Sequence, residues 1–185
     1  MRILRTTRLR LVPVTPANAE VLWKVLQEPD LRDYQDLPDV NREQFLRAVA
    51  KRPTRLGPGT VGRFEWLVHF PAADEPLGWV SLRIAESNTS TAEIGYSVIR
   101  THRRHGIATE AVKAIVDEGF RRAVVRRLRA YCLPENVASR AVLRKNGFTD
   151  EGMLPRGATV QGKPVDVILN TLERARWQAM RLSAV

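Results

Sequence analysis

The segment Arg100–Ala111, with the sequence RTHRRHGIATEA, joins a group of basic residues to the start of an amphipathic helix. From Ile107 onward, apolar residues recur with the spacing of one helix face, and charged residues occupy the opposite face. The first turn of a helix has backbone N–H groups without intrahelical partners and a partial positive charge, so it attracts anions. Gly106 has no Cβ and would let a bulky oxyanion approach the backbone. The segment therefore predicts a phosphate site at the start of a helix that packs on a sheet.

The hydrophobic pattern along the chain predicts an α/β fold with a sheet of mixed direction, mostly antiparallel at first and joined by crossover helices later. Thr15 and Pro16 are expected to start the first helix, and Asn41 with Gln44 is expected to form a capping box for the second. The predicted elements are a strand in 9–14, helices in 17–27 and 42–52, strands in 63–70, 76–84 and 91–99, a helix from 107, a strand in 128–133, a helix in 135–146, and strands in 148–154 and 164–172.

Length and composition limit the class of protein. A chain of 185 residues with 44% hydrophobic content can form one sizeable core, so we expect a single domain over residues 1–185. No apolar run reaches the length of a membrane span, and the first residues do not form the apolar block of a secretory signal. Cys132 is the only cysteine, which excludes an intrachain disulfide and fits a reducing cytoplasm. We therefore expect a cytoplasmic protein that does not bind membranes.

The net charge of +10 favours anionic partners, such as phosphorylated cofactors, nucleic acid or an RNA-rich particle. The densest basic run, residues 121–129, lacks interleaved aromatic residues that could stack on bases. Tyr96 and the four tryptophans belong to separate predicted elements, so they are expected to pack in the core or to line a pocket. Direct nucleic-acid binding is therefore the less favoured interpretation, and no residues are assigned to a metal site.

Several segments in order carry a resemblance to a known family. Arg103–Ala108 matches the Q/R-x-x-G-x-G/A acyl-CoA motif of the GNAT superfamily of N-acetyltransferases, and the predicted element order is that of the superfamily. The stretches AEIGYSV, ATEAVKAIVDEGF, NVASRAVLRKNGF and GKPVDVILNTLERARW resemble the branch that acetylates N-terminal amines of ribosomal proteins. The resemblance covers nearly the whole chain. It implies acetyl-CoA as donor and a largely antiparallel, seven-stranded sheet flanked by helices, with a splayed central strand pair.

The resemblance also implies where acetyl-CoA would bind. Backbone N–H groups from about Arg104 to Thr109 would hold the pyrophosphate, and Arg103 and Arg104 would add charge-assisted contacts. The end of the preceding strand would hold the pantetheine arm, with the N–H of Val98 facing the developing oxyanion, and Asn136 would bind the same arm. The complete set of expected contacts is Val98, Ile99, Arg100, Arg103, Arg104, His105, Gly106, Ile107, Ala108, Thr109 and Asn136.

Two residues are the candidates for catalysis. Glu93 lies on the strand that leads into the motif, near where related enzymes carry a catalytic glutamate, and could accept the amine proton directly or through a water. The alternative, that Glu93 only orients the acceptor or pairs with an arginine, stays open. Ser139 is expected to protonate the departing thiolate, because the superfamily's tyrosine acid is replaced by Leu143, seven residues after Asn136. Alternatively, Asn136 only caps its helix and Ser139 faces water. Glu110 is expected to be solvent-exposed.

The acidic segment 28–39, with the sequence EPDLRDYQDLPD, reverses the charge of this basic chain. It links the first two helices, which in the resembling family form one wall of the acceptor cleft, opposite the loop 156–163, so its carboxylates would attract a cationic amine at the mouth of the cleft. A solvated acidic loop is the alternative. The expected acceptor contacts are Asp33, Tyr34, Asp36 and Arg156.

The favoured function is acetyl transfer by direct attack of a primary amine, most simply the N-terminal amine of a ribosomal protein. Two alternatives remain: acetylation of a small amine such as an antibiotic, polyamine or amino acid, and a non-catalytic acyl-CoA-binding module. The residues do not identify the acceptor, and formation of a homodimer is left open.

Overall fold

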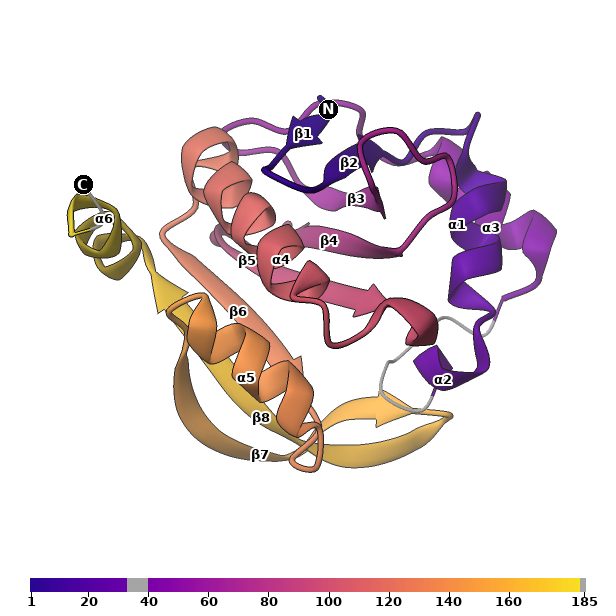
Figure 1. Cartoon of the computed structure of the whole chain (residues 1–185). Coiled ribbons are helices and arrows are strands. Elements are labelled where there is room, and N and C mark those ends of the chain that lie inside the picture. The colour runs from indigo at the N-terminus through magenta and orange to yellow at the C-terminus, as the bar shows by residue number, and fades with distance from the viewer. Residues whose placement is uncertain (33–39, 184–185) are drawn as a thin grey trace.

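A sheet of eight strands in the order β1-β2-β3-β4-β5-β6-β8-β7 forms the centre of the molecule (Figure 1). The structure is a computed structural model, and it describes residues 1–32 and 40–183. The elements are β1 (Leu4–Arg5), β2 (Arg10–Pro13), α1 (Ala19–Leu26), α2 (Pro29–Arg32), α3 (Arg42–Ala50), β3 (Gly62–His69), β4 (Gly78–Ala85), β5 (Asn88–Val98), the 3₁₀ helix η1 (Arg100–His102), α4 (Ile107–Glu118), the π-helix η2 (Gly119–Ala123), β6 (Arg127–Cys132), α5 (Val137–Lys145), β7 (Thr149–Val160), β8 (Lys163–Glu173) and α6 (Arg174–Leu182).

The central strands β5 and β6 are the parallel pair of this sheet, and they separate along their length. Their ladder contains three residue pairs, the last of them Glu93 with Arg129. Beyond that pair, β5 continues to Val98 and β6 continues to Cys132 without further pairing between them. The predicted mixed sheet and its splayed central strands are therefore confirmed. The helix α4 is the crossover that parallel strands require.

The sheet has one strand more than the seven predicted. Strand β1 pairs with β2 through only two residues, Leu4 with Leu11 and Arg5 with Arg10. A strand this short has no alternation of apolar and polar residues that a sequence pattern could reveal. The helices α2 and α6 were also not predicted from the sequence.

One predicted helix start is confirmed and another is wrong. The amide N of Gln44 donates to Asn41 Oδ1 at 2.9 Å, and Asn41 N donates to Gln44 Oε1 at 3.0 Å, which is the predicted capping box. By contrast, Thr15 does not cap α1. Its N–H donates to Asn18 Oδ1 at 2.7 Å, so residues 15–18 form a turn and α1 begins at Ala19.

The two faces of the sheet bury separate hydrophobic clusters, because strand residues alternate between the faces. Helices α4, α5 and α6 cover one face, and α1 with α3 cover part of the other (Figure 1). The first cluster includes Val80, Leu82, Ala92, Ile94, Ile107, Val112, Ile115, Leu143 and Trp177, and the second includes Leu22, Leu26, Phe45, Leu67 and Trp79. The N-terminus of α4 is thereby fixed close to the end of β5.

Glu65 on β3 is a buried charge that fixes the end of α3 against the sheet. Its side chain is 1% exposed and pairs with Arg52, and Arg63 Nη1 lies 3.6 Å from Glu65 Oε1. Burial, with a smaller effect of Arg63, lowers the pKa of Arg52 to about 10. A buried carboxylate paired in this way is costly to remove, because its partner cation would remain without compensation.

We expect Glu65→Ala to lower the free energy of unfolding by about 3–5 kcal/mol, measured by urea denaturation. The matched control is Glu43→Ala, which removes an exposed carboxylate paired with Arg47 one helical turn away. That control should cost no more than about 0.5 kcal/mol. Equal losses in the two variants would contradict a structural role for the buried pair.

Candidate active site

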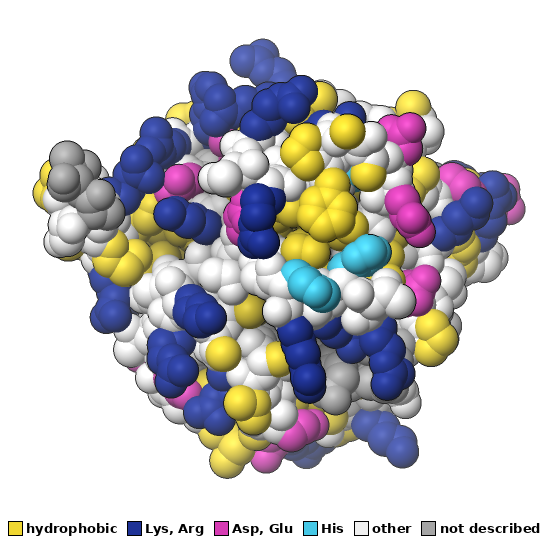
Figure 2. Space-filling model, in the orientation of Figure 1, with side chains coloured by type: hydrophobic (Ala, Val, Ile, Leu, Met, Phe, Trp, Pro, Cys, Tyr) yellow, Lys and Arg dark blue, Asp and Glu magenta, His cyan; other side chains and the backbone are white. Residues whose placement is uncertain are grey.

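The N-terminus of α4 has the backbone geometry of an anion site. Its N-cap, Gly106, has φ 75°, and Arg104 two residues earlier has φ 66°, so both residues adopt the left-handed conformation. The first intrahelical bond runs from Glu110 N to Gly106 O at 3.1 Å. The N–H groups of Ile107, Ala108 and Thr109 therefore precede the helix's own bonding, and an oxyanion could accept from them. Histidine and basic side chains gather around this end of α4 (Figure 2).

Arg103 connects this loop to the end of β5. Its Nε donates to the carbonyl oxygen of Val98 at 2.9 Å. The bond spans only five residues and fixes the path of the intervening 3₁₀ helix η1. Arg103 thus orders the loop from which the expected phosphate contacts arise, in addition to bringing positive charge to it.

Arg8 is a residue of this site that the sequence reasoning missed. Its Nη1 donates to His105 O at 3.0 Å and its Nε donates to Glu110 Oε2 at 2.8 Å. Arg8 N and Thr6 Oγ1 also donate to Glu110 Oε1, at 2.9 and 2.6 Å. The segment between β1 and β2 therefore braces both the loop and the first turn of α4. Arg8 and Glu110 are 102 positions apart, so no local pattern could have indicated the contact.

The expectation that Glu110 is solvent-exposed is wrong, since its side chain is only 18% exposed. Burial raises the pKa of this carboxyl, but the hydrogen bonds from Thr6 and Arg8 outweigh that effect and hold the pKa below its usual range. The folded state therefore favours the ionised carboxylate. The Glu110 carboxylate stabilises the fold at pH values above the pKa that Glu110 has in the unfolded chain. This stabilisation is lost as the pH falls through the pKa of Glu110 in the folded protein.

We expect Glu110→Gln to be less stable than the parent at pH 7, because the amide offers only one acceptor oxygen and no charge to Arg8. The difference in the free energy of unfolding should shrink as the pH falls below about 4.3, where the carboxylate of the unfolded chain protonates. Urea denaturation from pH 7 to pH 3.5 measures this difference. A difference that is constant over that range would contradict the assignment.

The separated strands direct backbone groups of β5 toward β6. The N–H of Ile99 donates to Leu77 O at 2.9 Å, so it points toward β4. Alternate residues of a strand point their N–H and C=O groups to opposite sides, and those of Val98 and Tyr96 therefore face the gap between β5 and β6. Val98 N–H has the direction expected for a pantetheine or oxyanion contact, whereas Ile99 N–H does not. Arg100, the third expected contact of this stretch, begins η1.

Ser139 lies beside this gap in the first turn of α5. Its N–H donates to Asn136 Oδ1 at 3.0 Å, so Asn136 caps the helix as the alternative interpretation stated. The Ser139 hydroxyl, in contrast, lies 2.9 Å from Tyr96 Oη on β5. Cys132 on β6 is buried, and its pKa is raised by burial, against the opposing effects of Asn170 and Ser139. Ser139 therefore connects side chains of both separated strands.

Glu93 lies at the base of the gap and on the other face of the sheet. Three positions separate it from Tyr96, so the two side chains point to opposite faces. Glu93 is opposite Arg83 on β4 and Arg129 on β6, and its Oε2 lies 3.6 Å from Arg129 Nη2. It lines a hollow with these two arginines. The structure thus contains the arginine pairing that the sequence left as one alternative, and the role of Glu93 as base stays a prediction.

The expected acceptor contacts are only partly described. Asp33, Tyr34 and Asp36 lie outside the described residues. Arg156 is exposed at an irregular position of β7, with φ 54°, and its N–H donates to Asp166 Oδ1 at 2.8 Å. Its place at the acceptor site stays a prediction.

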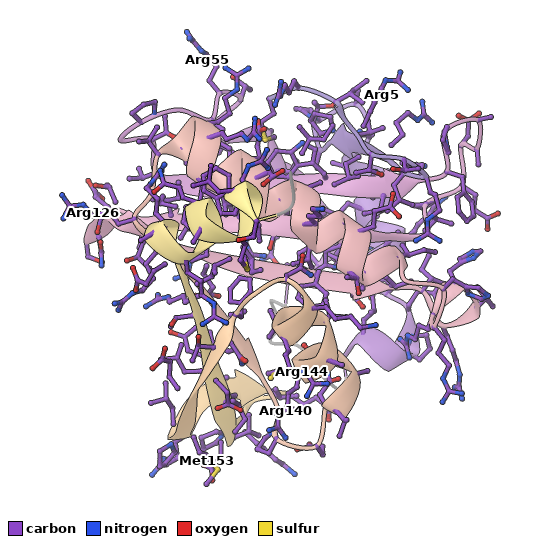
Figure 3. The ribbon with its side chains drawn as sticks, turned by 60° about the vertical axis from the view of Figure 1, so that its left-hand side comes forward. Arg5, Arg55, Arg126, Arg140, Arg144 and Met153 are labelled. Carbon is purple, nitrogen blue, oxygen red and sulfur yellow. The ribbon has the colours of Figure 1, made fainter. Side chains whose placement is uncertain are left out.

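The arginines labelled in Figure 3 come from several separate parts of the molecule. Arg5, Arg55 and Arg126 project outward from separate parts of the molecule, and Arg140 and Arg144 belong to α5 (Figure 3). Within the basic run 121–129, Arg127 pairs with Glu173 and the guanidinium of Arg121 lies 5.9 Å from the ring centre of Trp177. This distribution does not favour a nucleic-acid surface.

Residues 1–32 and 40–183 contain no group of three or more His, Cys, Asp or Glu side chains arranged to hold a metal ion. Within them, no helix combines the length and the apolar character needed to cross a membrane.

Comparison with known proteins decides the family. Residues 8–149 match the family model of the acetyltransferase (GNAT) domain. The chain belongs to the GNAT acetyltransferase family. It is 29% identical over 173 residues to p20, an uncharacterised N-acetyltransferase of Bacillus licheniformis, covering 93% of this chain and 96% of p20. The predicted family and the activity class, an N-acetyltransferase, are therefore confirmed.

Two further matches come from enzymes of the ribosomal-protein branch. The ribosomal-protein-serine acetyltransferase of Escherichia coli is 32% identical over 96 residues, which are 52% of this chain and 54% of that enzyme. The structure of RimL, a ribosomal L7/L12 α-N-protein acetyltransferase in complex with coenzyme A, superimposes with a TM-score of 0.76 at 22% identity, covering 93% of this chain and 98% of RimL. This likeness confirms the GNAT fold.

Proposed function

We propose that this GNAT acetyltransferase transfers the acetyl group of acetyl-CoA to the N-terminal amine of a protein of the ribosomal-protein type. The observation that carries the proposal is the combination of a glycine-initiated helix start, which has no side-chain cap, with the part of β5 before it that has separated from β6. The first feature suits a pyrophosphate and the second suits an extended chain of amides. RimL was solved with coenzyme A, which supports the same donor here.

The donors at the start of α4 and along β5 suit the phosphates and the amides of acetyl-CoA. In the proposed complex the N–H groups of Ile107, Ala108 and Thr109 donate to the pyrophosphate, and Arg103 and Arg104 add positive charge. A side chain at Gly106 would project where the phosphate approaches. The backbone groups of Val98 and Tyr96 that face the gap bind the amides of the pantetheine arm.

Acetyl transfer requires the amine to lose a proton and the thiolate to be stabilised as it leaves. Val98 N–H is the proposed donor to the carbonyl oxygen of the thioester, where negative charge develops. Ser139 is the proposed donor to the sulfur, since it lies beside the gap next to Cys132. Glu93, at the base of the gap, is the proposed proton acceptor for the amine.

The acceptor class rests on the relatives. Both the serine acetyltransferase of E. coli and RimL are named for ribosomal proteins. An acceptor amine is cationic before it reacts, and the acidic segment 28–39 would raise its encounter rate. A small amine satisfies the same chemistry, so the acceptor has to be identified by experiment.

A panel of acceptors tests the proposed function. Thiol release from acetyl-CoA should be seen with peptides that carry free N-termini of ribosomal proteins, and mass spectrometry should place the acetyl group on the α-amine. The same peptides with blocked N-termini are the matched control and should not react. Faster turnover with polyamines, amino acids or aminoglycosides would support the small-amine alternative. Coenzyme A binding with no turnover on any amine would support a non-catalytic module.

We expect Gly106→Ala to weaken acetyl-CoA binding by about tenfold or more, measured by calorimetry. The left-handed conformation at φ 75° costs an L-residue about 1 kcal/mol, and the new Cβ would lie 3.2 Å from Arg8 Nη2 on the side of the anion site. Gly57→Ala is the control, because a Cβ there has no atom within 4 Å. Unchanged affinity in Gly106→Ala, with an unchanged melting temperature, would remove the helix start from the donor site.

A further inference from the structure

The hydroxyl of Tyr96 is held at the gap between β5 and β6 by one residue of α5. Tyr96 Oη lies 3.1 Å from the carbonyl oxygen of Ser139 and 2.9 Å from its Oγ. The ring packs against the hydrophobic cluster under α4, and burial raises the pKa of the hydroxyl above its usual range. Tyr96 therefore keeps its proton at neutral pH, and that proton is available only to hydrogen-bond acceptors nearby.

The hydroxyls of Tyr96 and Ser139 have one proton each, and this limits the hydrogen bonds that Ser139 can donate. The carbonyl of Ser139 can only accept, and each hydroxyl has a single proton. When Tyr96 donates to that carbonyl, Ser139 Oγ–H points to Tyr96 Oη. When Tyr96 donates to Ser139 Oγ instead, the serine proton is turned away from Tyr96 and toward another acceptor. The two arrangements differ only in hydroxyl rotation, and no heavy atom has to move.

We propose that Tyr96 is a positioning residue for Ser139. Its hydroxyl donates to Ser139 Oγ and so directs the serine proton into a hydrogen bond with the thiolate sulfur of coenzyme A. The inference rests on the proposed function, because it takes Ser139 to be the residue that meets the sulfur. No bond to hydrogen is broken in this step. The pair stabilises the anion by polarising one hydroxyl with another, which is stronger than one isolated hydroxyl in a buried site.

The location of Ser139 supports the proposal that its hydroxyl proton points toward the sulfur. Ser139 also lies near enough to Cys132 on β6 to lower the pKa of that thiol slightly, and it contacts Tyr96 on β5, so it lies between the two separated strands. The thiol of Cys132 is only a weak hydrogen-bond acceptor for the Ser139 hydroxyl. The thiolate sulfur of coenzyme A, once in the gap, would be a stronger acceptor for the same proton. A phenylalanine at position 96 would pack equally well, so packing alone does not explain the hydroxyl.

The test follows the thiol of bound coenzyme A, and it needs no acceptor. The pKa of that thiol is measured by the ultraviolet absorbance of the thiolate in complexes of the parent, Tyr96→Phe, Ser139→Ala and the double variant. Hydrogen-bond donation to the thiolate lowers this pKa, so both single variants should raise it. The double variant should match Ser139→Ala, because Tyr96 acts only through the serine. Tyr131→Phe, a hydroxyl deletion on β6 next to Cys132 in sequence, should leave it unchanged.

Turnover gives the second readout. Ser139→Ala should lower kcat about a hundredfold and Tyr96→Phe about tenfold, with acetyl-CoA affinity unchanged and no further loss in the double variant. A thiol pKa in Tyr96→Phe equal to that of the parent would overturn the proposal, and so would losses that multiply in the double variant. Either result leaves acetyl transfer by the parent intact. Absence of coenzyme A binding by the parent would instead overturn the proposed function itself.

Discussion

The end of pairing between β5 and β6 after Glu93 is the constraint on which the rest of the site depends. A sheet normally satisfies the backbone groups of its inner strands, and leaving them unpaired inside the molecule costs free energy. The protein compensates in part, since Arg103 Nε donates to the backbone oxygen of Val98 on β5. Beyond Glu93 the side of β5 that faces β6 resembles the edge of a sheet, to which an extended ligand with amides of its own can be added.

The same crossover that makes β5 and β6 parallel also places the anion site. A parallel pair needs a connection across one face of the sheet, and here that connection includes α4. The helix therefore begins just after β5 ends, so its unpaired N–H groups lie at the open end of the gap. Arg8 and Glu110 fix this helix start from a distant part of the chain. A ligand with a phosphate at one end and amides behind it fits both features.

Features set by neighbouring residues could be predicted, and those set by distant residues could not. The capping box of Asn41 and the start of α4 at Gly106 depend on a few consecutive residues, and both were found. The bracing of Glu110 by Arg8 and the contact of Tyr96 with Ser139, 43 positions apart, have no local signal. The two-residue strand β1 is defined by its pairing with β2. Long-range polar contacts of this kind depend on the packed fold.

The alternation of side chains along β5 separates the two proton-handling groups of the proposed reaction. Glu93 points to the face that α4 does not cover, and Tyr96, three residues later, points toward α5 on the other face. In the proposed complex, coenzyme A held at the start of α4 would bring its sulfur to the side of Ser139. An amine that approaches from the opposite face would meet Glu93 first. In the proposed reaction, Glu93 would take the proton of the amine and Ser139 would donate a hydrogen bond to the sulfur, so the donor and the acceptor would meet in the gap between the strands.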